Sequence, residues 1–182
     1  SVTYTLGRMT GSGNRVPLLT ACVQWRSIDR SLMVEQLLPN DFKEFLRLLN
    51  ETGVEYLLIG GYAVGYHGYP RTTADMDIWV ANTPGNAAKV VSVFHQFGMN
   101  DPSLTVDLFQ QPNKVIRMGV APMRIVVLTE IDGVTFSECY AAKESTEIDG
   151  QLVHLISLPH LRKNKRASGR HKDLDDLEHL PE

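Results

Sequence analysis

The amino-acid sequence predicts an α/β fold in which a short mixed β-sheet is flanked by helices. Apolar runs of strand length alternate with segments whose apolar residues recur every three or four positions, as on one face of a helix. The first clear strand run ends at a glycine pair, Gly60-Gly61, and the next begins with Asp75 and Asp77. A length of 182 residues, with 43% hydrophobic and 21% charged residues, suits one globular domain of this kind.

The chain divides into an N-terminal extension and a domain. Residues 1–32 are rich in Gly, Ser, Thr and Asn and carry no regular apolar pattern, so we expect an extension that is partly disordered. Residues 33–182 carry the alternating strand and helix patterns and form the predicted domain.

The domain is expected to begin with an amphipathic helix over Phe42, Phe45 and Leu49, capped by Asn40 or Asp41 and ended at residue 53. The other predicted elements are a strand over 54–59, a short helix over 61–67, a strand over 75–80, a helix from 83 to 98, strands over 114–118 and 123–128, a short helix over 136–142, a hairpin turn at 148–151, and two helices over 158–167 and 172–180.

The two carboxylates and the glycine pair together predict a site for a metal-bound polyphosphate. Side chains alternate along a strand, so Asp75 and Asp77 share one face while Met76 points into the core. Two like charges on one face are stabilised by a hard cation such as Mg²⁺ or Mn²⁺ between them. Gly60-Gly61 would let the backbone approach a phosphate closely. The alternatives are an exposed edge strand with two solvated acids, and an ordinary tight turn.

A basic cluster lies next to an acidic one near the end of the chain. The basic residues are Arg162, Lys163, Lys165, Arg166, Arg170 and Lys172, and the acidic residues are Asp173, Asp175, Asp176 and Glu178. Judged on these residues alone, a solvated pair of helices with mutual charge pairing is the favoured interpretation.

A long motif resembles a known family. The sequence Gly-Gly-Tyr-Ala-Val-x-x-His-Gly-x-x-Arg-x-Thr-x-Asp-x-Asp, from Gly60 to Asp77, is similar to the DNA polymerase β-like nucleotidyltransferase superfamily. More narrowly, it resembles the abortive-infection type nucleotidyltransferase toxins. The resemblance continues through Asn164 to Leu177 and covers residues 38–180.

The resemblance implies a polymerase β-like nucleotidyltransferase fold and a magnesium-dependent transfer of a nucleoside monophosphate from a nucleoside triphosphate (NTP) to RNA, such as tRNA, or to a protein. It also implies membership of a toxin–antitoxin pair, with a cognate antitoxin as partner. The residue roles it implies are metal binding and catalysis for Asp75 and Asp77, and phosphate binding for Gly60, Gly61, Arg71, Lys165, Arg170 and Lys172. Lys165 is the best match to the lysine that faces the triphosphate, and Arg71 would either position phosphates or brace the Asp-x-Asp segment.

One position departs from the family pattern. Relatives carry a third carboxylate on the strand over 123–128, at the position of Val126. Glu130 has the same strand parity but lies four residues on, roughly 13 Å along an extended strand. The sequence therefore leaves open whether the chain is an active nucleotidyltransferase. The alternative is a catalytically weakened nucleotide-binding pseudoenzyme or a protein-interaction subunit.

Composition restricts the remaining possibilities. The formal net charge of −3 gives no support to nucleic-acid binding through overall charge. Only Cys22 and Cys139 occur, which predicts neither a disulfide framework nor a zinc site. The sequence has no apolar run of about 20 residues and no clear secretory pattern, so we expect a cytoplasmic protein without a membrane partner.

Overall fold

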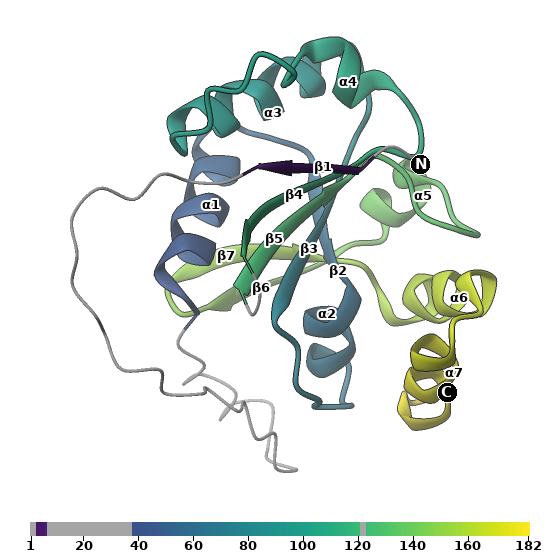
Figure 1. Cartoon of the computed structure of the whole chain (residues 1–182). Helices are drawn as coiled ribbons and strands as arrows, with labels where there is room; N and C mark the ends of the chain where they lie inside the picture. Colours follow the sequence, from purple (N-terminus) through teal and green to yellow (C-terminus); the bar gives the residue numbers. More distant parts are fainter. Residues whose placement is uncertain (1–2, 7–37, 121–122) are drawn as a thin grey trace.

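A seven-stranded mixed β-sheet forms the centre of the structure, a computed structural model that describes residues 3–6, 38–120 and 123–182 (Figure 1). The strands are β1 (Thr3–Leu6), β2 (Tyr56–Ile59), β3 (Asp75–Val80), β4 (Val115–Val120), β5 (Met123–Leu128), β6 (Glu144–Ile148) and β7 (Gln151–Leu155). Their order across the sheet is β1-β4-β5-β3-β2-β7-β6. The prediction of an α/β fold with a mixed sheet flanked by helices is confirmed.

The strand β3 lies in the middle of this sheet. It pairs in parallel with β5 on one side and antiparallel with β2 on the other. Its central position explains the apolar second half of the strand, in which Ile78, Trp79 and Val80 are all buried. The strand that carries the two carboxylates is therefore held on both sides by backbone hydrogen bonds.

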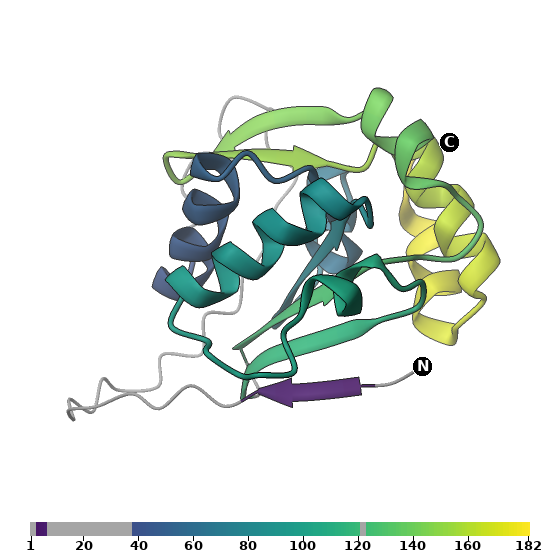
Figure 2. The same cartoon turned by 90° about the horizontal axis from the view of Figure 1, so that it is seen from above.

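Helices cover both faces of the sheet (Figures 1 and 2). The helices on one face are α1 (Asn40–Glu51), α3 (Pro84–Gln96) and α4 (Val106–Gln110), which share a large apolar core with alternate strand residues such as Met76 and Ile78. The other helices are α2 (Gly60–Tyr66), α5 (Phe136–Ala141), α6 (Leu158–Ser168) and α7 (His171–His179). A smaller core on their side contains Leu57, Trp79 and Leu161. This second face also carries the two carboxylates.

Most predicted elements are present, with differences at their ends. The helix α1 begins at Asn40 after Pro39, and it has no side-chain capping hydrogen bond, so the prediction that Asn40 or Asp41 caps it is wrong. The first predicted strand forms only over its last four residues, Tyr56–Ile59. The helix α4 was not predicted because five residues are too few to show a helical period, although the Thr105 side chain caps it by accepting from the Leu108 N–H.

Part of the N-terminal extension is described. Thr3–Leu6 forms β1, an edge strand that runs parallel to β4 and pairs Thr3 with Val115. The rest of residues 1–32 lies outside the described part of the chain, so the expected disorder and the boundary at residue 33 stay predictions.

The helices of the described ranges are all short or polar. None of them combines the length and the apolar character that crossing a membrane requires.

Candidate functional site

The strand β3 presents both predicted acids on one face. Asp75 and Asp77 are partly exposed, whereas Met76 and Ile78 between and after them are buried in the core of the opposite face. Because β3 lies between β2 and β5, the alternative of an exposed edge strand is wrong. The two carboxylates are thus held side by side on a rigid element.

The glycine pair packs directly against side chains of the site. Gly60 begins α2 with φ +63°, a conformation that favours glycine, and a Cβ there would overlap the Asp77 carboxylate. A Cβ on Gly61 would overlap Thr73 and lie 3.2 Å from Arg71 Nη1. Both positions therefore require glycine, because protein groups of the site approach the backbone closely there.

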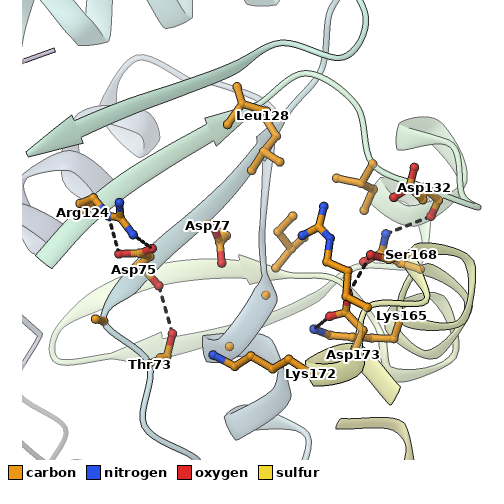
Figure 3. Close-up of a pocket in the computed structure, with 18 of the residues that line it drawn as sticks. Thr73, Asp75, Asp77, Arg124, Leu128, Asp132, Lys165, Ser168, Lys172 and Asp173 are labelled. Atoms are coloured by element: carbon orange, nitrogen blue, oxygen red, sulfur yellow. Dashed lines mark hydrogen bonds and ion pairs between the residues drawn. The ribbon is translucent and has the colours of Figure 1, made fainter. Parts of the chain in front are cut away.

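Asp77 is the carboxylate that is available to a ligand. Among the described residues its oxygens have no hydrogen-bond partner, and Figure 3 shows the side chain pointing into the pocket. Burial, and then the neighbouring charge of Asp75, raise the pKa of Asp77 to about 6, against the weaker opposing effect of Lys165, Arg71 and Lys172. A cation placed beside Asp77 would relieve both causes.

Asp75 already has a cationic partner, Arg124 on β5. Asp75 and Arg124 are direct partners in the parallel register, and the guanidinium donates from Nε to Oδ1 at 3.0 Å and from Nη2 to Oδ2 at 2.8 Å. This contact was not predicted from the sequence. The signal was present in the strand parity, because Arg124 lies two residues before Val126 and must share its face.

Val126 stands directly opposite Asp77 in the same parallel register and is buried. The register thus places an apolar side chain beside Asp77, at the position where the resemblance expects a third carboxylate. Glu130 lies beyond the end of β5, although it lines the same cavity.

The C-terminal helices carry a buried network of charges. Lys165 on α6 donates from Nζ to Asp173 Oδ1 at 2.6 Å and forms an ion pair with Asp176 Oδ2 at 2.8 Å. Arg71, from the segment before β3, donates to Asp176 through Nε at 2.5 Å and Nη2 at 2.9 Å. Lys165 is 5% exposed and Asp176 is fully buried. Burial raises the pKa of Asp176, but the hydrogen bonds from Arg71 and Lys165 outweigh it, and the net pKa is lowered.

A cavity of about 670 Å³ lies between these two groups of residues (Figure 3). We call one side the strand wall (Asp75, Asp77 and Arg124, together with Val126, which pairs with Asp77 but does not itself line the cavity) and the other the helix wall (Arg71, Lys165, Arg170, Lys172 and Asp173, together with Asp176, which is buried behind them). All eight residues predicted for the site line the cavity: Gly60, Gly61, Arg71, Asp75, Asp77, Lys165, Arg170 and Lys172. The structure therefore brings together residues that are more than 100 positions apart in the sequence.

The cations of the helix wall differ in their availability. Lys165 and Arg71 are engaged with carboxylates, whereas Arg170 and Lys172 are exposed and have no ion-pair partner among the described residues. One Arg71 nitrogen, Nη1, is buried without a hydrogen-bond partner near Gly61. Such an orphaned donor suits an anionic oxygen, because a buried unpaired N–H is costly.

The donor set suits a hard divalent cation that keeps other ligands. In the described ranges no three His, Cys, Asp or Glu side chains form a metal-binding cluster. Two carboxylates on one face, with one of them free, fit Mg²⁺ or Mn²⁺ that completes its coordination with water and phosphate oxygens. The two carboxylates would therefore hold a metal ion together with an anionic ligand that supplies some of the remaining oxygen ligands.

Comparison with known proteins gives no family assignment. Neither a scan of protein-family models nor a search of curated proteins finds a match to this chain.

Proposed function

We propose that this protein is a nucleotidyltransferase of the polymerase β-like fold that binds an NTP with Mg²⁺ in the 670 Å³ cavity. The reaction transfers the nucleoside monophosphate to a hydroxyl of an RNA or protein acceptor and releases pyrophosphate. One observation carries the proposal: the eight residues chosen from the sequence line one cavity, with carboxylates on one wall and cations on the other. This arrangement suits a metal ion on the strand wall and phosphates that reach the helix wall.

The residues have distinct roles in this proposal. Asp75 and Asp77 hold the metal ion, which neutralises charge on the phosphates when bound. Arg170 and Lys172 offset the charge of the outer phosphates, because they line the cavity and have no carboxylate partner within the described ranges. Arg71 offers its orphaned Nη1 to a phosphate oxygen near the glycine pair. Direct contact of the Lys165 ammonium with a phosphate, as the resemblance implies, stays a prediction, and it requires exchange of a carboxylate partner.

A second candidate function is nucleotide binding without transfer, in a pseudoenzyme or a protein-interaction subunit. The observation that favours it is Val126, which is buried directly opposite Asp77. A missing general base costs on the order of 10²–10⁴ in rate while two carboxylates can still hold a metal–nucleotide complex. In either case we propose a role in a toxin–antitoxin pair, because the long central motif resembles the abortive-infection type toxins.

The test has a binding part and a transfer part. Each NTP, labelled at the α-phosphate, is incubated with the protein and Mg²⁺, with total cell RNA or with cell protein. Label in RNA or in protein identifies the acceptor class, and binding without label transfer identifies the pseudoenzyme.

Calorimetry then assigns the site. We expect NTP binding that disappears with chelator and in the double variant Asp75→Asn, Asp77→Asn. The charge-matched control is Asp107→Asn with Glu147→Gln, two exposed acids outside the cavity, and it should bind normally. Undiminished binding by the Asp75, Asp77 double variant would show that the cavity is not the nucleotide site.

A further inference from the structure

Arg124 engages the carboxylate that the proposed function assigns to the metal ion. Both oxygens of Asp75 accept hydrogen bonds from the guanidinium, in a bidentate pair at 3.0 and 2.8 Å. The fork takes two of the roughly four lone-pair sites of the carboxylate. A metal ion that uses the remaining sites would lie close to the guanidinium, and the two cations would repel each other. Arg124 and a metal ion therefore compete for Asp75.

The ion pair between Arg124 and Asp75 lies where its two side chains can separate. The side chains are 38% exposed for Arg124 and 29% exposed for Asp75, and both residues line the cavity. Figure 3 shows the guanidinium directed at the Asp75 carboxylate. Partly exposed ion pairs contribute little to stability, so separating this one costs little. The guanidinium also lines the cavity, where incoming phosphates could become its new partners.

We propose that Arg124 competes with the metal ion for Asp75 and yields it when the metal arrives together with a polyphosphate. The inference rests on the proposed function, because it takes Asp75 and Asp77 as the metal-binding pair. Without a nucleotide, the guanidinium holds Asp75 and leaves Asp77 alone for the metal, which therefore binds weakly. A metal–NTP complex supplies a metal ion for Asp75 and phosphates for Arg124, so that metal and nucleotide bind cooperatively. Arg124 is thus a positioning residue that couples metal loading to nucleotide binding.

The test measures the affinity for Mn²⁺ alone, without nucleotide, from the electron paramagnetic resonance signal of the free ion. Arg124→Gln should tighten Mn²⁺ binding by about 3- to 10-fold, as expected for removal of a competing, partly exposed ion pair. Arg124→Lys keeps the charge but loses the fork, and it should give an intermediate affinity. The cooperativity between Mn²⁺ and a non-hydrolysable NTP analogue should fall in both variants.

A matched control separates competition from the general loss of a positive charge. Arg117 on β4 faces the same side of the sheet, because it pairs with Val126 in the antiparallel register. It has no ion-pair partner within the described chain. Arg117→Gln should change Mn²⁺ affinity by less than about 2-fold at moderate salt, since screening weakens unpaired surface charges. In an Asp75→Asn background, Arg124→Gln should give no gain.

The possible results separate this inference from the proposed function. If the wild type binds Mg²⁺–NTP and Arg124→Gln leaves Mn²⁺ affinity unchanged, the competition is wrong and the proposed function stands. An equal gain in Arg117→Gln, or a gain that persists without the Asp75 carboxylate, also overturns the competition. A gain in Arg124→Gln that depends on Asp75, in a protein that binds no NTP, supports the competition and overturns the proposed function.

Discussion

The two walls of the cavity both carry acidic and basic side chains, but Lys165, Asp173 and Asp176 of the helix wall are more deeply buried and more fully paired than the charges of the strand wall. On the strand wall, Asp77 has no partner among the described residues and Asp75 has one partner that is 38% exposed. On the helix wall, Lys165 has two carboxylate partners and Asp176 has two cationic partners. Asp176 is fully buried, and Lys165 is 5% exposed.

The difference indicates which charges hold the fold and which can bind a ligand. Removing one member of a buried ion pair leaves an uncompensated charge in a medium of low dielectric constant, which is costly. A partly exposed pair, or an unpaired carboxylate, can take a new partner at little cost. The network of Arg71, Lys165 and Asp176 therefore fixes the position of α6 and α7 relative to β3. The charges that can take a ligand are those of the strand wall and the exposed Arg170 and Lys172 at the rim of the helix wall.

The largest expected effect concerns the apolar position of the strand wall. Val126→Asp would add a third carboxylate directly opposite Asp77 and next to Arg117 in the sheet register. We expect nucleotidyl transfer or pyrophosphate release to increase by about 10²–10⁴, the range of a positioned general base. The stability penalty should be small with Mg²⁺ and larger with chelator, because the metal offsets the added charge.

Val126→Asn is the matched control for this variant, since it has nearly the same shape without the charge. It should not increase the rate. A wild type that is already as fast as Val126→Asp would indicate that another group, such as Glu130, supplies the base. If Val126→Asp unfolds even with Mg²⁺, Val126 belongs to the apolar core and is not a position beside the metal site.

The next largest effect concerns the helix wall. Asp176→Asn keeps the shape of the side chain but removes the negative charge that compensates Arg71 and the buried Lys165. We expect a loss of about 3–5 kcal/mol in the free energy of unfolding, measured by urea denaturation. Asp175→Asn is the control, because its side chain is 54% exposed, and it should change stability by less than about 1 kcal/mol. Equal losses in the two variants would contradict a special role for the buried network.

The two walls should also differ in their response to pH. The pKa of Asp77 is raised from 3.8 to about 6, so its ionisation costs stability as pH rises from 3.8 to 6, and the cost is constant above that. In chelator, Asp77→Asn should therefore be more stable than the wild type at pH 7, by roughly 1–3 kcal/mol, with no difference below about pH 4.

The lowered pKa of Asp176 acts in the opposite sense. Its contribution to the free energy of unfolding is present above pH 3.8 and is lost as pH falls below that value. Urea denaturation at pH 7 and pH 4 measures the first effect, and a further measurement at about pH 2 measures the second. An Asp77→Asn variant that is less stable at pH 7 would disprove the first.

The contrast between the walls also shows what the sequence could predict. The range of β3 follows from its apolar run, and the shared face of Asp75 and Asp77 follows from strand parity, both of which are local properties. The importance of Val126 came from the family resemblance, and the strand register places it opposite Asp77. The pairing of Arg71 with Asp176 joins residues 105 positions apart, and no local pattern contains it. The sequence suggested a solvated pair of helices whose charges pair with one another. The pairing is correct for Lys165 with Asp173 and Asp176, but these three residues are buried and not solvated. It could not show that Arg71 joins them, because that contact depends on how the segment before β3 packs against α6 and α7. Strand parity places Arg124 on the same face as Val126, but the contact with Asp75 also requires the pairing of β3 with β5.

The smallest expected effect concerns the exposed cations at the rim of the helix wall. Lys172 extends into the cavity from α7 without a carboxylate partner among the described residues (Figure 3). Lys172→Gln should weaken NTP binding by about 3- to 10-fold, as expected for loss of one exposed charge that contacts a phosphate. The loss should be smaller for a nucleoside monophosphate and should shrink at high salt, because a solvent-exposed contact is screened.

Lys163→Gln is the control, since Lys163 is exposed on α6 outside the cavity. The NTP affinity of this variant should stay within about 2-fold of the wild type. Calorimetry at two salt concentrations measures these differences. Equal losses for triphosphate and monophosphate would mean that Lys172 does not contact the outer phosphates.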